Sequence, residues 1–257
     1  MRAALLSLAL LVGCTTGGGT TKVTETGNPK VTETGNPQVT ARISVTARTT
    51  DANAVSFEDD SGDLVVDTAW LVFGDIRFVR DDQCDEPAEA EVTVDGPFVV
   101  DLVDKAAGID AFKMGVGDYC RVRIPMDRGA QLPPEAPDAL DDAAVAIDAR
   151  RFDGTNVFIT SRTTEDIELK SDGQPVLIDQ NNRHLVLGID LATWFENMDL
   201  DDAEAEPNGD ILIDDDHNDD LLDLFEDNIE DAMDLFEDSD EDGELDDDED
   251  DDPLDER

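Results

Sequence analysis

Twelve residues near the end of the chain, DSDEDGELDDDE at 238–249, carry oxygen ligands at a regular spacing. Ca²⁺ binds six to eight oxygen atoms, and a loop that wraps one ion supplies them from its positions 1, 3, 5, 7, 9 and 12. The stretch therefore predicts a calcium site, in which Glu244 contributes its backbone carbonyl. The predicted ligands are Asp238, Asp240, Asp242, Glu244, Asp246 and Glu249.

The two positions that are not acidic carry most of the information, because an aspartate-rich run supplies carboxylates in any frame. Gly243 falls at position 6, where the chain must turn sharply, and Leu245 falls at position 8. The pattern resembles the calcium loop of EF-hand proteins. No helical pattern follows it, so it is closer to the isolated Asp-rich loops of dockerin-type and thrombospondin-type modules. That resemblance implies a dissociation constant of about 10⁻⁴–10⁻³ M. A solvated acidic tail is the alternative.

A second stretch, EAEPNGDILIDD at 204–215, has oxygen-bearing residues at comparable positions. It includes Pro207 and several weak ligands, so we expect a turn here, with a second calcium site as the alternative. The candidate residues are Glu204, Glu206, Asn208, Gly209, Ile211 and Asp215.

Apolar residues spaced by three and four precede the first stretch and predict an amphipathic helix that leads into it. Such a helix would end at Glu237 and Asp238, where negative charge is unfavourable without a cation. We expect its apolar stripe to pack on the body of the protein, or on a short helix that Asp190 caps and that carries Trp194. A receptor groove is the alternative. The stripe consists of Leu222, Phe225, Ile229, Met233 and Phe236.

The chain offers little for catalysis. Its two histidines are His184, at the start of a predicted strand, and His217, which lies among aspartates and is a candidate ligand for a transition metal. No second histidine lies at ligand spacing from His217. A nucleophile elbow, a phosphate-binding loop and a metalloprotease helix are all absent from the sequence. We therefore expect a non-enzymatic protein. A carboxylate pair for glycoside hydrolysis in a periplasmic hydrolase is the alternative, because acids are so abundant.

The charge is strongly negative. The chain has 66 acidic and 18 basic residues, for a formal net charge of −48. Binding to a nucleic-acid backbone requires clustered cations, so that class of partner is excluded. Cations are favoured as ligands. Adaptation of an acidic surface to a saline habitat, without specific calcium binding, is the alternative explanation of the charge.

The first residues, MRAALLSLALLVGC, combine one cation with an apolar run that is too short to span a bilayer. They predict a signal peptide at 1–13. The end of the run resembles the lipobox of bacterial lipoproteins, which implies acylation of Cys14 and a membrane anchor in the outer membrane, with the protein facing the periplasm or the cell surface. Two cysteines remain, Cys84 and Cys120. An even remainder in an oxidising compartment favours a disulfide, and two buried thiols are the alternative.

Residues 14–37 predict a tether, because a small, flexible stretch is followed by two copies of KVTETGNP. From residue 38 the apolar period becomes two, and short alternating runs continue to residue 189. Asp-Gly pairs at 95–96 and 153–154 indicate hairpin turns. In YCRVRI at 119–124 the face with Cys120 is expected to be buried and Tyr119 to lie on the other face. The long polar segment 128–142 is expected to shape a binding surface.

These features predict a mainly β protein, an antiparallel β-sandwich at 38–189 followed by an acidic helical segment at 190–257. The layout resembles a group of uncharacterised bacterial lipoproteins in the residues 96–102, Cys84, Cys120 and DLATWF at 190–195. That resemblance implies an architecture and no activity. We expect a lipid-anchored envelope protein with a structural or adhesive role, or one that binds a protein or glycan partner.

Overall fold

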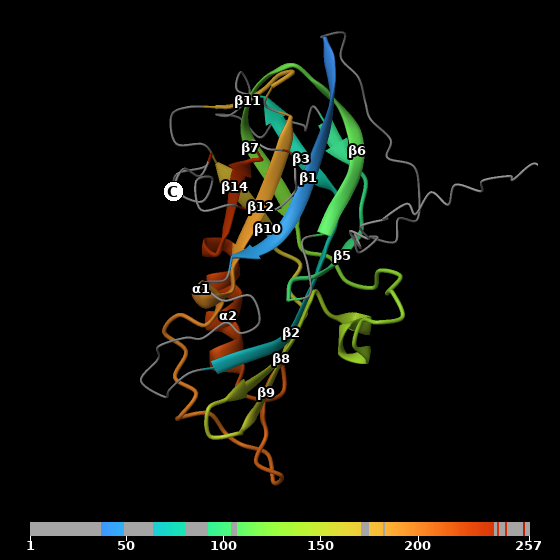
Figure 1. The fold of residues 1–257 in the computed structure, drawn as a ribbon. Coiled ribbons are helices and arrows are strands. Elements are labelled where there is room, and N and C mark those ends of the chain that lie inside the picture. Colours follow the sequence, from blue (N-terminus) through green and yellow to red (C-terminus); the bar gives the residue numbers. More distant parts are fainter. Residues whose placement is uncertain are drawn as a thin grey trace, which may run out of the picture.

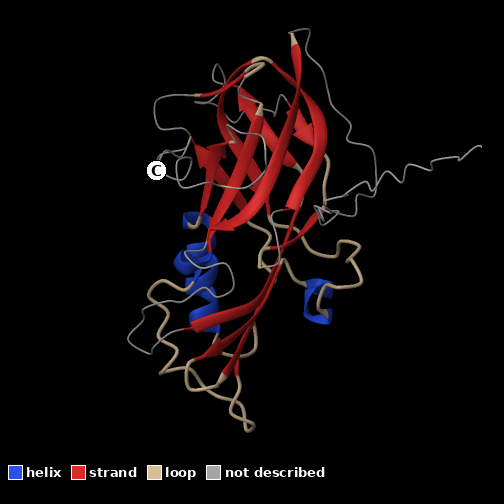
Figure 2. Cartoon of the chain, in the orientation of Figure 1, coloured by secondary structure: helices blue, strands red, loops and turns tan. Residues whose placement is uncertain are grey.

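The computed structural model describes residues 37–48, 64–80, 92–103, 107–170, 175–181 and 183–238, together with residues 241, 245 and 254. The fold is mainly β, as predicted, with few helices (Figure 2). None of the helices in these residues is long and apolar enough to cross a membrane. The helices are α1 (Leu191–Trp194), α2 (Asp219–Asp231) and a 3-10 helix (Asp138–Asp142). The strands are β1 (Gln38–Arg48), β2 (Leu64–Phe73), β3 (Ile76–Arg80), β4 (Val92–Val94), β5 (Phe98–Asp101), β6 (Ala107–Gly115), β7 (Gly117–Pro125), β8 (Val145–Arg151), β9 (Asn156–Ser161), β10 (Asp166–Lys170), β11 (Val176–Ile178), β12 (His184–Asp190), β13 (Ile211–Ile213) and β14 (Met233–Glu237).

The strands form three sheets. Sheet A has the order β14-β12-β1-β6, sheet B the order β13-β9-β8-β2-β5, and sheet C the order β10-β7-β3-β4 with β11 beside β7. All pairs are antiparallel except β1 with β12 and β13 with β9. Sheets A and C lie face to face in the upper half of Figure 1, where Phe78 of β3 meets Phe112 of β6 with ring centroids 6.0 Å apart. Sheet B and α2 form the lower half.

The first strand follows the predicted alternation. Val39, Ala41, Ile43 and Val45 are buried in the main core, while the residues between them are half-buried or exposed. The strand begins at Gln38, the boundary predicted for the folded body. The alternation predicts the strand here because one face of β1 packs on the core, whereas the residues on its other face are polar and keep some contact with solvent.

One of the two predicted hairpins is wrong. Asp153-Gly154 does join the antiparallel pair β8 and β9. The segment around Asp95-Gly96 instead changes sheets, because β4 pairs with β3 in sheet C and β5 pairs with β2 in sheet B. The chain also changes sheets at Gly74, between β2 of sheet B and β3 of sheet C. The corner at Gly74 lies in contact with the corner at Gly96. The Gly96 N–H donates to the Asp75 carboxylate at 2.9 Å.

The predicted orientation of Tyr119 is also wrong. Two residues of β7, Tyr119 and Arg121, pair with consecutive residues of β3, Arg80 and Val79, so Cys120 is the extra residue of a β-bulge. The bulge turns Tyr119 into the core, where it is fully buried and meets the Phe78 ring edge-on at 6.0 Å. A strict alternation cannot reveal such an insertion.

The segment 128–142 covers sheet B. Its 3-10 helix places Leu140, which is fully buried, against Trp70 and Val72 on the outward side of β2. Leu132 and Ala136 pack on the same small cluster. Part of this segment, which was expected to shape a binding surface, therefore contributes to a second apolar core.

The C-terminal segment departs most from the sequence prediction. Asp190 caps α1 as expected, and its carboxylate accepts the Ala192 N–H at 2.8 Å. The helix predicted to reach residue 237 ends at Asp231, and the residues Met233–Glu237 form β14, an edge strand paired with β12. Through β13 and β14, residues 190–257 contribute to sheets A and B, so they share the core of the residues that precede them.

Candidate functional site

The predicted calcium stretch begins on sheet A. Asp238 directly follows β14, is 5% exposed, and donates its backbone N–H to the carbonyl of His184 at 3.0 Å. The other predicted ligands lie outside the described residues, namely Asp240, Asp242, Glu244, Asp246 and Glu249. Among the side chains that the structure does describe, no three His, Cys, Asp or Glu residues are grouped as a metal site.

A strand, and not a helix, leads into this stretch. The predicted helix dipole at Glu237 and Asp238 is therefore wrong, and it provides no reason for a cation there, because the backbone dipoles of a β-strand largely cancel. The stretch differs from an EF-hand in what precedes it, and any ion would be bound beside a sheet edge.

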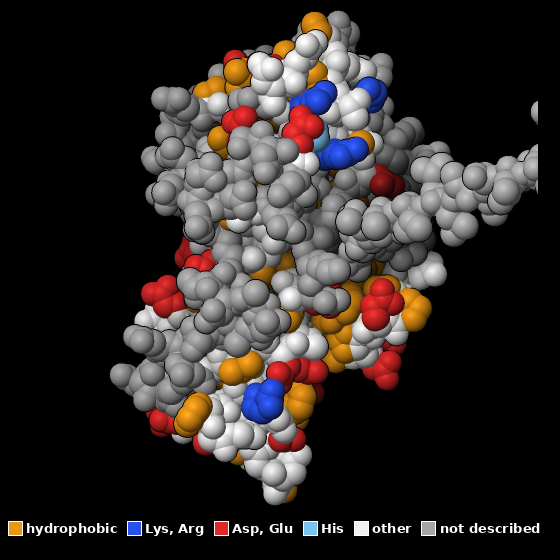
Figure 3. All heavy atoms as spheres, in the orientation of Figure 1, with side chains coloured by type: hydrophobic (Ala, Val, Ile, Leu, Met, Phe, Trp, Pro, Cys, Tyr) orange, Lys and Arg blue, Asp and Glu red, His pale blue; other side chains and the backbone are white. Residues whose placement is uncertain are grey.

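Three described residues attach the acidic stretch to sheet A. Besides Asp238, the carboxylate of Glu241 lies 3.2 Å from the Arg183 guanidinium and 3.8 Å from the His184 ring. The Leu254 N–H donates to the carbonyl of Leu235 on β14 at 2.7 Å. On the visible face of the molecule, most of the Lys and Arg side chains gather in this upper half (Figure 3).

The same part of sheet A is covered on its outward side. Val186 and Phe236 are directly opposite each other on β12 and β14, and both are fully buried. They alternate with Leu187 and Leu235, which belong to the main core, so they point to the other side of the sheet. Leu254 also packs on the core cluster. Both Asp238 and Leu254 therefore contact strands of sheet A whose side chains are largely buried.

Glu241 turns the chain sharply. Its φ of 64° lies in the left-handed region, which is costly for a residue other than glycine, asparagine or aspartate. The surroundings must hold such a conformation, and the contacts with Arg183 and His184 do so. Sequence reasoning missed Glu241, although its position between two predicted ligands was visible.

The second candidate stretch, 204–215, is a turn followed by a strand. Residues 206–210 form the turn, with Gly209 at φ 94°, and the residues Ile211–Ile213 are β13. The carboxylate of Asp215 pairs with Arg162 at 2.7 Å, and the amide of Asn208 bonds the Asp210 carboxylate at 2.6 Å. The expected turn is confirmed by two backbone hydrogen bonds, from the Glu206 N–H to Asp210 and from the Gly209 N–H to Glu206.

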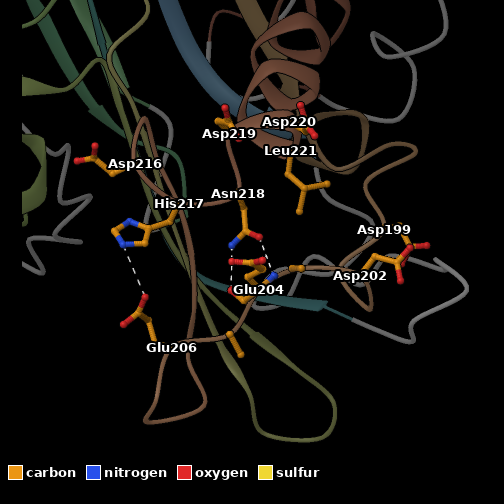
Figure 4. A pocket seen from close by; sticks show the side chains of 12 residues that line it. Asp199, Asp202, Glu204, Glu206, Asp216, His217, Asn218, Asp219, Asp220 and Leu221 are labelled. Carbon is orange, nitrogen blue, oxygen red and sulfur yellow. Dashed lines mark hydrogen bonds and ion pairs between the residues drawn. The ribbon is translucent and has the colours of Figure 1, made fainter.

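A pocket of about 530 Å³ lies beside this turn and carries seven carboxylates and one histidine. Asn218 holds it together, because its side chain accepts the Glu204 N–H at 2.7 Å and donates to the carbonyls of Glu204 and Leu212. Its left-handed backbone, φ 54°, is one that asparagine tolerates. Figure 4 shows the His217 ring directed at Glu206, while Asp219 and Asp220 lie apart from it. The lining residues are Asp199, Asp202, Ala203, Glu204, Ala205, Glu206, Asp216, His217, Asn218, Asp219, Asp220 and Leu221.

His217 lies between two carboxylates. Its Nδ1 is 2.8 Å from the Asp214 carboxylate and its Nε2 is 3.6 Å from Glu206. The hydrogen bond with Asp214 is the main reason why the pKa of His217 is raised. Partial burial raises the pKa of Asp214, but hydrogen bonds from Asp216 and His217 and the charge of His217 outweigh it, so that pKa is lowered. His217 is thus a partner in ion pairs. Among the described residues, it does not belong to a group of three or more side chains that could hold a metal ion.

We expect the Asp214→Asn variant to lower the pKa of His217, and Glu206→Gln to lower it less, because Asp214 makes the direct hydrogen bond. A pKa raised in the folded state stabilises the protein fully below the unfolded value of 6.5, and the contribution is lost as pH rises through the folded pKa. NMR titration of the two histidines, assigned with His184→Gln, measures this. An unchanged His217 titration in Asp214→Asn would contradict the ion pair.

The three cysteines are only partly described. Cys14 and Cys84 lie outside the described residues. Cys120, at the bulge, is 8% exposed, and its Sγ is 3.3 Å from the carbonyl oxygen of Arg80. Arg80 ends β3, and Cys84 follows it by four residues, which span at most about 14 Å. A Cys84–Cys120 disulfide stays a prediction that this placement allows.

No protein-family model matches the chain, and comparison with curated proteins and with solved structures gives no match.

Proposed function

We propose that this chain is an exported, lipid-anchored envelope protein without enzymatic activity, in which Ca²⁺ binds the stretch 238–249 and fixes it on the edge of sheet A. The role is structural, adhesive or partner-binding. Residues 14–37 form the tether, Cys14 carries the lipid, and a disulfide joins Cys84 to Cys120. Peptide mapping by mass spectrometry without reduction tests the disulfide, which fails if both cysteines are recovered as free thiols.

The attachment of the acidic stretch to sheet A is the observation that carries the calcium proposal. A solvated tail would have no reason to return to the protein, yet Asp238, Glu241 and Leu254 all contact sheet A or its edge. Eleven acidic residues lie between positions 239 and 253. Holding both ends of such a segment at one edge brings like charges together, which costs free energy that a bound divalent cation offsets.

The contacts of Glu241 limit where the ion would lie. Its carboxylate is directed at Arg183 and His184, so it is not free to face the ion. Position 4 of the predicted loop is also not a ligand position. The side chains at positions 1, 3, 5, 9 and 12 are left to bind Ca²⁺, and Glu241 serves to hold the turn against the sheet.

The test is a calcium titration by calorimetry of the chain without residues 1–14, in concentrated NaCl, beside Glu249→Gln and Glu244→Gln. Both variants remove one negative charge by the same substitution. Only Glu249 supplies its side chain as a ligand, whereas Glu244 supplies its backbone carbonyl. We expect saturable binding of about one ion, lost in Glu249→Gln and retained in Glu244→Gln.

Equal, unsaturable heat in all three proteins would reject the calcium site. Adaptation to a saline habitat would then be the explanation of the negative charge. Equal losses in the two variants would show that overall charge, and not coordination, drives binding, because salt screens long-range attraction but does not remove a coordination shell. Either result rejects the calcium part of the proposal and leaves the lipid anchor to be tested separately.

A further inference from the structure

Asn208 is the one asparagine of the chain that precedes a glycine. The backbone nitrogen of the following residue can attack an asparagine side chain, and glycine hinders this attack least because it has no Cβ. Asn208 and Gly209 are both exposed, in the turn that leads into β13. This turn lies in the orange segment at the lower tip of the molecule (Figure 1). Residue type and exposure therefore single out Asn208 for this chemistry.

The reaction is a deamidation. The Gly209 nitrogen gives up its proton and attacks the Asn208 Cγ. A bond forms between these two atoms, the bond from Cγ to Nδ2 breaks, and the side-chain nitrogen leaves as ammonia with that proton. Water then opens the resulting cyclic imide at either carbonyl and gives aspartate or isoaspartate, in which the main chain runs through Cβ and Cγ. Water is the only co-reactant, and no oxidant or reductant takes part.

The native turn restrains both reacting groups. The Asn208 Nδ2 donates to the Asp210 carboxylate at 2.6 Å, and its Oδ1 accepts the Asp210 N–H at 3.1 Å. The Gly209 N–H donates to the carbonyl of Glu206 at 2.8 Å. The Asp210 carboxylate is itself fixed, because the Asn156 side chain of β9 donates to it at 2.9 Å. These hydrogen bonds must break before the Asn208 side chain can turn back to the Gly209 nitrogen.

We propose that Asn208 is a site of spontaneous modification to aspartate and isoaspartate, and that the Asp210 carboxylate sets the rate by holding the side-chain amide. The hydrogen bond to this carboxylate is charge-assisted and is therefore the strongest restraint on the amide. The aspartate product places a carboxylate opposite that of Asp210, where like charges repel. The isoaspartate product adds an atom to the main chain of the turn. Both products disturb the turn that carries Glu206, a residue that lines the acidic pocket.

The test follows Asn208 in the full native chain during incubation at mildly alkaline pH, by peptide mapping with mass spectrometry after peptic digestion in acid. The variants are Asp210→Ala and Asp210→Asn. Both remove one negative charge and keep the backbone N–H of residue 210. Only Asp210→Asn keeps a side-chain oxygen that accepts from the Asn208 Nδ2. The unmodified sequence in urea gives the rate without the turn.

We expect Asn208 to be converted faster than any other asparagine of the native chain. Asp210→Ala should speed its conversion by about tenfold, because it removes a charge-assisted hydrogen bond. Asp210→Asn should speed it clearly less, because a weaker, neutral hydrogen bond remains. Urea should speed it at least as much as Asp210→Ala.

Faster conversion of another asparagine overturns the proposal, and so does an equal rate of Asn208 conversion with and without Asp210→Ala. Equal acceleration in the two variants would show that the negative charge near Gly209, and not the hydrogen bond, sets the rate. That result overturns the assigned role of Asp210.

Discussion

Replacing Phe225 by alanine is expected to lower the free energy of unfolding by about 3–5 kcal/mol, the range for a large aromatic side chain removed from a core. Phe225 lies in the middle of α2 and is fully buried. Its ring meets Trp194 at 5.7 Å and Phe195 at 6.2 Å, both edge-on. The contact with Trp194 attaches α2 to α1. Urea unfolding followed by tryptophan fluorescence measures the loss.

The matched control is Phe152→Ala. Phe152 is 88% exposed at the β8–β9 turn, so the same substitution removes almost no buried surface. Its free energy of unfolding should change by less than about 0.5 kcal/mol, as surface substitutions usually do. Equal effects of the two variants would mean that α2 does not pack on α1 as described.

The Gly96→Ala variant is expected to lower the free energy of unfolding by about 1–3 kcal/mol or more, because an added methyl group overpacks the contact between two corners. A Cβ at Gly96 would lie 2.5 Å from the carbonyl oxygen of Gly74 and 2.6 Å from its carbonyl carbon. Both are backbone atoms, so neither can rotate away. The clash would separate the corner at Gly74, where the chain passes from sheet B to sheet C, from the corner at Gly96, where it passes back.

Gly108→Ala provides the comparison. Gly108 lies in β6, is exposed, and has no atom within 4 Å of an added Cβ. Alanine there should be neutral or slightly stabilising, because it reduces the entropy of the unfolded chain. Thermal unfolding of the two variants side by side separates steric overlap from a general effect of replacing glycine. A neutral Gly96→Ala would show that the two corners are not in contact.

The features that sequence reasoning predicted correctly are local. The alternation in β1, the Asp190 cap and the Asp153-Gly154 turn each depend on a few neighbouring residues, whose backbone preference the rest of the fold does not oppose. The segment of β14 shows the limit. Met233 and Phe236 fit a helical spacing, and Met233 and Leu235 fit a strand equally well. Pairing with β12, more than forty residues earlier, decides between them.

The candidate sites divide in the same way. The carboxylate spacing of 238–249 can be read from the sequence alone, and the turn at 206–210 was expected from its glycine and proline. The pairing of Glu241 with Arg183 depends on which strands are neighbours. The spacing of apolar residues along the sequence does not show which distant segments pair in the folded protein.

The order of strands in sheet A sets the order in which the protein can fold. β1 lies between β6 and β12, so the first described strand needs partners that lie about 70 and about 140 residues later in the chain. Contacts between such distant segments form slowly, because a long loop must close before they are gained. If the N-terminus leaves the ribosome or crosses a membrane first, one edge of β1 stays unpaired until residues 184–190 of β12 follow it. A chaperone that shields one exposed strand during synthesis would therefore act on residues 38–48.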